Sequence, residues 1–385
     1  MILSKKLASI QESATIAIST EAKKLKAQGI KIYDFSIGEP DFPLAEEMFS
    51  AGVKALKENI IKYTPASGIS ELKIAIAKKL HRENNIPCSE KNITVTNGAK
   101  QALYNVFMAI LNPGDEVIIP RPYWVSYLEQ VKLCDGVPII AETDHFQIKA
   151  DFIAKKITKK TKAIIINSPC NPTGSVIETE ELKKIAELAV KKDLFIISDE
   201  IYEKIIYEKK HLSIASLNKE MFSRTITING FSKTYGITGL RVGYACADEN
   251  IIKLMNSIQG HTTSNASSIA QKMALAALTI PEKRIQTWVQ EFQEKRDLLC
   301  KKIKGMNLPL LTPSGAFYVL VKIPIKTIDS VSFCRQLLQE QHVACVPGEA
   351  FGEEGSFRIS YACSKKDIQE GLEKIQLFLK KISKQ

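Results

Sequence analysis

The feature that most constrains the fold is an alternation of short, continuously apolar segments with amphipathic ones. Such apolar segments lie at 93–96, 117–119, 163–166, 194–197, 225–228 and 242–246. Between some of them, apolar residues recur at helical spacing, as at 69–84 and 178–191. Strands that are apolar on both faces indicate a mainly parallel sheet covered by helices. The sequence therefore predicts an α/β fold.

A second, smaller α+β unit is predicted after Pro281. It begins with a long helical pattern and continues through alternating strand-like and helical segments at 317–321, 329–341, 356–361 and 366–381. We expect an N-terminal segment over 1–44 that packs on the small unit, a large domain over 45–283 and a small domain over 284–385. The long helix, at about 282–304, would link the two domains. A chain of 385 residues fits this division.

The composition excludes several other classes of protein. No apolar run reaches the roughly 18–20 residues of a membrane span, and the N-terminus lacks the apolar block of a secretory signal. The net charge of +11 is spread along the chain, and only eight of the 53 basic residues are Arg. Without a recognisable binding module, we expect neither a nucleic-acid nor a membrane partner. The eight cysteines form no CxxC pair, which favours reduced cytoplasmic thiols and no metal site.

Polar residues follow the predicted strands at the place where such sheets bind ligands. In open α/β sheets, ligands bind beyond the carboxyl ends of the strands. The segments expected there are Gly98–Lys100, Asn167–Pro172, Asp199–Tyr202 and Gly230–Lys233. Together they favour a site for an anionic, ring-bearing cofactor. Cys170, within the second segment, is given no role.

Each of these segments has a chemical and an ordinary structural interpretation. Backbone N–H groups of Gly98–Lys100 could cradle a phosphate at a helix start, or simply form a small-residue turn. Asp199 could cap a helix or pair with a protonated pyridine nitrogen. Tyr202 and Asn171 could donate hydrogen bonds to a phenolate oxygen, or be ordinary polar residues of an interface.

The most informative segment is Gly230–Gly243. It places Lys233 in a loop of small residues after a strand, with Arg241 eight residues further on among glycines. A lysine that is desolvated or near other cations can form a Schiff base, and Arg241 would meet a phosphate. The alternative is an exposed lysine in a flexible glycine-rich loop.

These residues resemble a known family. Gly230–Gly243 is similar to the pyridoxal-phosphate (PLP) attachment signature of class I aminotransferases. The order of the other segments resembles the branch Ib aspartate aminotransferases, through Ser36–Phe42, Tyr63, Gly98–Lys100, Tyr123–Trp124, Asn167–Gly174, Asp199–Tyr202, Lys233, Arg241 and Arg358–Tyr361. The resemblance implies fold type I, in which a large PLP-binding domain with a seven-stranded sheet joins a smaller α+β domain.

The resemblance also implies how the cofactor, PLP, is held. Lys233 would carry it as a Schiff base and move the proton, and Asp199 would pair with the ring nitrogen. Tyr202 and Asn171 would hydrogen-bond the ring oxygen, and Trp124 would stack on the ring and border the substrate. The remaining residues would surround the phosphate, with Tyr63 coming from the other subunit of a homodimer with shared active sites: Gly98, Ala99, Lys100, Ser232, Arg241 and Tyr63.

For the substrate, the resemblance implies two carboxylate contacts. Arg358 would grip the α-carboxylate as a bidentate fork, assisted by Asn171 and the Gly38 backbone. Lys100 would meet the distal carboxylate of aspartate or glutamate, with Thr15 at a second substrate-side position. The alternative for Lys100 is that it only solvates the phosphate region.

The predicted function is PLP-dependent, ping-pong transamination between L-aspartate and 2-oxoglutarate, giving oxaloacetate and L-glutamate. The alternatives on this fold are an aspartate/prephenate aminotransferase, an aromatic or alanine aminotransferase, and a β-C–S lyase. Outside PLP metabolism, a transcription regulator with an aminotransferase-like domain is disfavoured. Only about 30 residues precede Ser36, too few for a helix-turn-helix domain.

Overall fold

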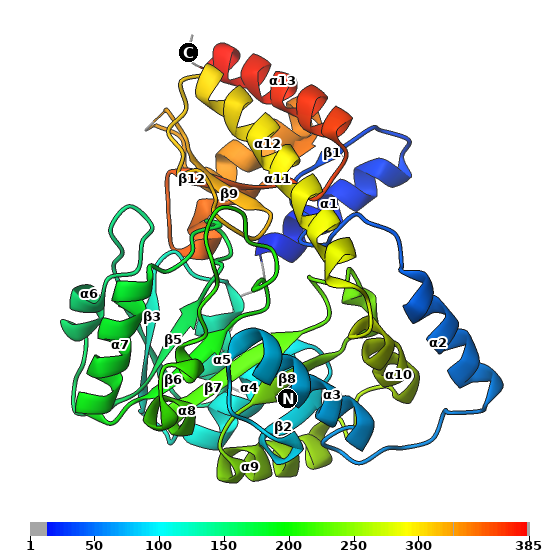
Figure 1. Ribbon diagram of the computed structural model, residues 1–385. Helices are drawn as coiled ribbons and strands as arrows, with labels where there is room; N and C mark the ends of the chain where they lie inside the picture. The colour runs from blue at the N-terminus through cyan, green and yellow to red at the C-terminus, as the bar shows by residue number, and fades with distance from the viewer. Residues whose placement is uncertain (1–13, 326, 383–385) are drawn as a thin grey trace, which may run out of the picture.

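The centre of the structure, a computed structural model that describes residues 14–325 and 327–382, is a seven-stranded sheet (Figure 1). Its strand order is β2-β8-β7-β6-β5-β3-β4, and β8 is antiparallel to both of its neighbours. The other neighbouring pairs are parallel, which confirms the predicted sheet. In that order the strands are Ile93–Thr96, Gly243–Cys246, Thr225–Gly230, Phe195–Asp199, Thr161–Asn167, Glu116–Pro120 and Val137–Ala141.

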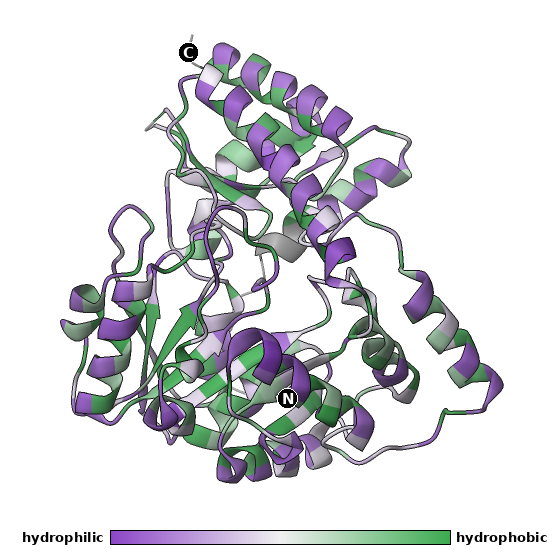
Figure 2. Ribbon diagram, in the orientation of Figure 1, coloured by the Kyte–Doolittle hydropathy of each residue, from purple (hydrophilic) through white to green (hydrophobic). Residues whose placement is uncertain are grey.

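Both faces of this sheet are buried, because consecutive isoleucines of one strand enter different cores. Ile165 packs with α4 (Ala99–Ile110), α5 (Ser126–Leu133) and α9 (Glu249–Thr262). Its neighbours Ile164 and Ile166 pack with a second set of helices, α6 (Ala150–Ala154), α7 (Thr179–Lys192) and α8 (Lys219–Arg224). Figure 2 shows the apolar strands between helices that are mixed in hydropathy. The continuously apolar strands therefore result from burial on both sides.

A third group of helices covers the β2 end of the sheet. It comprises α2 (Glu46–Lys57), α3 (Ser70–Asn84) and α10 (Ser268–Ala277). In α3, Ile76 and Leu80 are buried against Val95 of β2 and Tyr244 of β8. None of the helices in the described residues combines the length and apolar character that crossing a membrane requires.

The long helix α11 (Glu282–Gly305) connects this sheet to a second, smaller group of elements. There, β11 (Val346–Pro347), β12 (Ser356–Ser360) and β9 (Tyr318–Lys322) form an antiparallel sheet in that order. Two helices, α12 (Ser330–Gln341) and α13 (Lys365–Ile382), pack on it (Figure 1). The predicted elements of this part are present, with ends within two residues of those expected.

The N-terminal segment lies against this smaller group. In it, β1 (Tyr33–Asp34) pairs in parallel with β10 (Val343–Ala344). Ala22 of α1 (Ala14–Ala27) is buried with Leu338 and Ala344. We propose that the chain divides into 1–44, 45–283 and 284–385, with the first part on the third; these contacts support that division.

Candidate active site

A cavity of about 490 Å³ lies at the carboxyl ends of the parallel strands. Asn167 and Asp199 are the last residues of β5 and β6, and Lys233 follows β7. Most of the residues predicted for the site line this cavity: Gly38, Ala99, Lys100, Trp124, Asn171, Asp199, Tyr202, Ser232, Lys233, Arg241 and Arg358. Residues from distant parts of the chain thus meet at one cavity.

Lys233 is largely buried in this cavity. Its Nζ donates a hydrogen bond to the carbonyl oxygen of Gly38 at 2.6 Å. Burial lowers the pKa of Lys233 to about 8, with Arg358 and Arg241 acting in the same direction and Glu39 opposing it. At pH 7 about one side chain in ten would then carry a neutral amine, against fewer than one in a thousand for an ordinary lysine, and the neutral amine is the form that a nucleophile or base requires.

Asp199 is a buried carboxylate held by two donors. It accepts a hydrogen bond from Tyr127 Oη at 2.6 Å and one from the Ile201 backbone N–H at 3.3 Å. Burial raises the pKa of Asp199 to about 6, and these hydrogen bonds partly offset that effect. The sequence does not predict Tyr127 as a site residue; it lies in the first turn of α5, three residues after Trp124.

The start of α4 forms a cradle that lacks side-chain bulk. Gly98 has φ +80°, and a Cβ there would lie 2.5 Å from Arg241 Nη2. A Cβ on Gly243 would lie 2.3 Å from the backbone nitrogen of Ala99. Arg241, at φ +53°, donates to the Thr238 carbonyl oxygen at 2.8 Å. Exposed N–H groups at a helix start beside a guanidinium form a site that favours a phosphate.

Arg358 reaches the cavity from β12 and is only 2% exposed. Its Nη1 donates to Asn171 Oδ1 at 2.9 Å and its Nη2 to the Ser36 carbonyl oxygen at 2.9 Å. Its Nε has no hydrogen-bond partner among the described residues, and burial lowers its pKa. The guanidinium lies 4.4 Å from the ring centre of Tyr318. This buried cation is thus oriented without being neutralised by an acid.

Tyr318 also contacts Tyr202, with 3.0 Å between the two hydroxyl oxygens. A Cβ on Gly38 would lie 2.7 Å from the Tyr318 hydroxyl, so glycine is required there. We had not predicted Tyr318 as a site residue. No local signal marks it, because it lies in a buried strand-like segment far from the other site residues.

Lys100 and Trp124 form the side of the cavity next to α5. Lys100 Nζ lies 4.9 Å from the centre of the Trp124 ring, which itself packs edge-on against Tyr127 at 5.3 Å. Burial lowers the pKa of Lys100, and Arg241 adds to this effect. Lys100 forms no ion pair with any described residue, so its charge remains available to a ligand.

Two predicted site residues, Gly98 and Tyr63, do not line the cavity. Gly98 lies behind Arg241, as described above. Tyr63 is 90% exposed on the loop between α2 and α3, and is not among the residues that line the cavity of its own chain. Thr15 falls in α1, but its side chain lies outside the described part of the structure.

The charges that line the cavity are unbalanced. Four are basic, namely Lys100, Lys233, Arg241 and Arg358, whereas only Glu39 and Asp199 are acidic. Fold and site thus define the class: an α/β enzyme with a cationic cavity at the carboxyl ends of its strands.

The chain belongs to the class I and II aminotransferase family, whose model matches residues 30–375. It is 42% identical to an aspartate aminotransferase of Bacillus subtilis over the full length of both chains. It is 41% identical to a probable aspartate/prephenate aminotransferase of Aquifex aeolicus, over 99% of each chain. The solved aspartate aminotransferase from Thermus thermophilus with maleate superposes with a TM-score of 0.95 at 39% identity, covering 98% of this chain and 99% of that one. The predicted family and the α/β fold are confirmed.

Proposed function

We propose that this aminotransferase uses PLP to transfer the amino group between L-aspartate and 2-oxoglutarate, giving oxaloacetate and L-glutamate by a ping-pong mechanism. The observation that carries the proposal is the surplus of basic over acidic side chains that line the cavity around Lys233 and Asp199. The full-length relatives named aspartate aminotransferase support the substrate assignment. A β-C–S lyase would not need the distal cation Lys100.

The residues present fit the cofactor. The glycine-lined start of α4, with Arg241 and Ser232, would hold its phosphate. Asp199 would pair with its ring nitrogen, and Tyr202 and Asn171 with its ring oxygen. When bound, PLP supplies an electron sink for the carbon that bears the amino group.

Lys233 would both attach the cofactor and transfer the proton. Because its pKa is lowered to about 8, its Nζ can take the proton from the substrate α-carbon near neutral pH. Trp124 would cover the ring face and exclude water from that proton transfer.

Two cations separated in the cavity would orient the substrate. Arg358 would bind the α-carboxylate as a fork, since Asn171 and Ser36 fix its plane. Lys100 would bind the distal carboxylate from beside Trp124. A dicarboxylic substrate uses both cations, whereas alanine uses only Arg358.

Lys100→Ala tests the substrate assignment. We expect KM for aspartate and glutamate to rise by roughly 10–100-fold, the effect of one charge-assisted hydrogen bond. Alanine is the internal control, and its KM should remain unchanged. An equal rise for all three amino acids would place Lys100 on the phosphate side and contradict the assignment.

Prephenate is a second candidate acceptor, because relatives at about 40% identity are named aspartate/prephenate aminotransferases. Spectral half-reactions started from the aminated enzyme, with 2-oxoglutarate and prephenate in parallel, distinguish the two acceptors.

We also propose a cytoplasmic homodimer. Tyr63 is 90% exposed, and apolar side chains along α2 and the following loop are more than half exposed, namely Phe49, Leu56 and Ile61. These would be covered by a second copy, and Tyr63 would reach the partner's phosphate site. The eight cysteines, all of which the structure describes, are free, a state that a reducing compartment maintains. Light scattering at micromolar concentration tests the dimer.

A further inference from the structure

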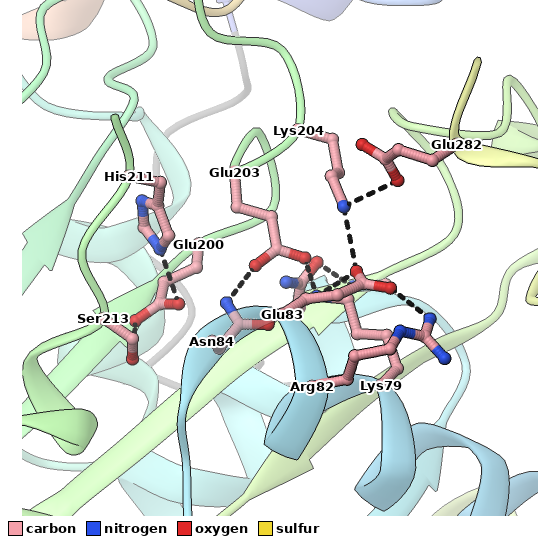
Figure 3. Close-up of polar contacts among 12 residues, drawn as sticks. Lys79, Arg82, Glu83, Asn84, Glu200, Glu203, Lys204, His211, Ser213 and Glu282 are labelled. Atoms are coloured by element: carbon pink, nitrogen blue, oxygen red, sulfur yellow. Dashed lines mark hydrogen bonds and ion pairs between the residues drawn. The ribbon is translucent and has the colours of Figure 1, made fainter. Parts of the chain in front are cut away.

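The turn that follows β6 connects the cavity to a second polar region. Asp199, which ends β6, and Tyr202 of the turn line the cavity, whereas Glu200 and Glu203 do not. Both glutamates are buried, at 1% and 8% exposure. They point into a cluster of charged side chains that also includes residues of α3 and of the His211 loop (Figure 3). The two glutamates therefore link this turn, next to the site residues, to the surrounding polar cluster.

Glu200 is held through both of its carboxylate oxygens. Its Oε1 accepts from Ser198 Oγ at 2.9 Å and from Ser213 Oγ at 2.8 Å. Its Oε2 lies 2.8 Å from His211 Nε2. The His211 pKa is raised: burial alone would lower it, but Glu200 outweighs that effect. The carboxylate is therefore fixed from several directions.

Glu203 is held by the C-terminal half of α3. Its two oxygens accept hydrogen bonds from Lys79 Nζ and from Asn84 Nδ2. Lys79 is itself buried, at 5% exposure. Burial would raise the pKa of Glu203, but Lys79 above all lowers it to about 2. Lys79 Nζ also bonds Asn84 Oδ1 at 2.8 Å, so the three side chains form a closed set.

In the outer part of the cluster, acidic and basic side chains also pair with one another. Glu83 is paired with Lys204 at 2.9 Å, and Lys204 is paired with Glu282 of α11 at 3.0 Å. Arg82 also contacts Glu83. Each acid labelled in Figure 3 therefore lies beside a basic side chain.

Glu200, Glu203 and His211 offer ligand atoms within 4.8 Å of one another, a spacing that could suit a metal ion. Both carboxylates already have partners, however: Lys79 provides the cation at Glu203, and His211 Nε2 faces Glu200. The cluster is therefore better suited to fixing the turn than to binding a metal.

We propose that Glu200 and Glu203 are positioning residues. Held by His211 and by Lys79, they fix the turn that places Asp199 and Tyr202 in the cavity. The expected effect on catalysis rests on the proposed function. The anchoring of the turn does not, because it can be measured in protein without cofactor.

The main test removes one anchor without leaving a buried charge unpaired. The double variant Lys79→Met/Glu203→Gln deletes both charges, and Glu203→Gln alone serves as a second, more conservative variant. Lys78→Met is the matched control, because Lys78 is the exposed neighbour of Lys79 on the same helix. Two quantities are measured in each: hydrogen exchange of amides 200–203 in cofactor-free protein, and kcat and KM for aspartate in loaded enzyme.

We expect the amides of Glu200 and Glu203, which donate to Ile228 O and Glu200 O, to exchange at least about tenfold faster in the double variant. We expect kcat to fall by about 100-fold, as for a small misplacement of catalytic groups, with KM changed far less. Glu203→Gln leaves Lys79 beside a second acid, Glu83 at 3.8 Å, so it should show the same changes to a smaller degree. Lys78→Met should show none.

Unchanged exchange in both anchor variants overturns the proposal, whatever happens to turnover. Faster exchange with wild-type kcat also overturns it, since the anchors would then serve stability alone. If wild-type protein fails to turn over aspartate, the proposed function is contradicted, and the exchange measurement still decides whether the anchors hold the turn.

Discussion

Two buried polar regions are joined by the turn after β6, and they differ in how their charges are neutralised. Around the cavity, the buried Arg358 lies without an acidic partner among the described residues, and the largely buried Lys233 bonds only a carbonyl oxygen. In the cluster behind the turn, Lys79 and Glu203 neutralise each other directly. Unpaired buried charge indicates a ligand that is to be bound, whereas paired buried charge indicates a structural anchor.

The largest contrast is expected from removing the lysine of each region. Lys233→Met should lower turnover by about 10⁴-fold or more, because it removes both the attachment point and the base. The melting temperature of the cofactor-free protein should stay equal or rise, since a cation disfavoured by burial has been removed. Steady-state kinetics measure the turnover, and thermal melts measure the stability. A clear fall in melting temperature would contradict the expected difference between the two regions.

The corresponding change in the cluster should act in the opposite way. Lys79→Met leaves Glu203 buried without its partner, so the free energy of unfolding should fall by about 3–5 kcal/mol. Lys78→Met, at an exposed position on the same helix, should change it by no more than about 0.5 kcal/mol. Denaturant titration of both variants measures the difference. If the two variants lose the same free energy of unfolding, the cluster is not a structural anchor.

A smaller effect is expected for Tyr127→Phe, which removes the hydroxyl that donates to Asp199. The pKa of Asp199, already raised by burial to about 6, should rise further and weaken its pairing with the cofactor nitrogen. A hydrogen bond to a charged group is worth about 1.5–3 kcal/mol, so cofactor affinity should fall by the corresponding factor. Titration with PLP measures it, with Tyr104→Phe as the control; equal affinities in both would assign Tyr127 to packing.

The most gradual effect is a pH dependence of stability in the cofactor-free protein. The folded pKa of Lys233 is about 8, against 10.5 for an ordinary lysine. Between these values the unfolded chain binds more protons, so wild-type stability should rise with pH relative to Lys233→Met, by at most about 1.4 kcal/mol per pH unit. If the difference in stability between wild-type protein and Lys233→Met does not change from pH 8 to 10.5, the lysine is not desolvated.

Much of this fold could be predicted from sequence, because burial on both sheet faces makes strands continuously apolar. The strand β4 (Val137–Ala141) was missed: it contains Pro138, lies at the sheet edge and is only partly buried. The two-residue strands β1 and β10 carry no periodic signal, since their pairing joins residues about 310 positions apart.

The site was predictable where a residue follows a strand end, as with Asp199 and Lys233. It was not predictable where a residue acts through tertiary contact alone, as with Tyr318. Glu200 and Glu203 carry no signal of burial in the sequence, because their partners Lys79 and His211 come from other segments. Residue roles, domain boundaries and the dimer remain predictions.

The most direct test of the account is to find where the cofactor attaches. Purified protein is incubated with PLP, reduced with borohydride, digested and analysed by mass spectrometry. The account predicts a visible absorption band before reduction, one dominant adduct on Lys233, and loss of both in Lys233→Met. A colourless protein, or an adduct spread over surface lysines and unchanged in that variant, would contradict it.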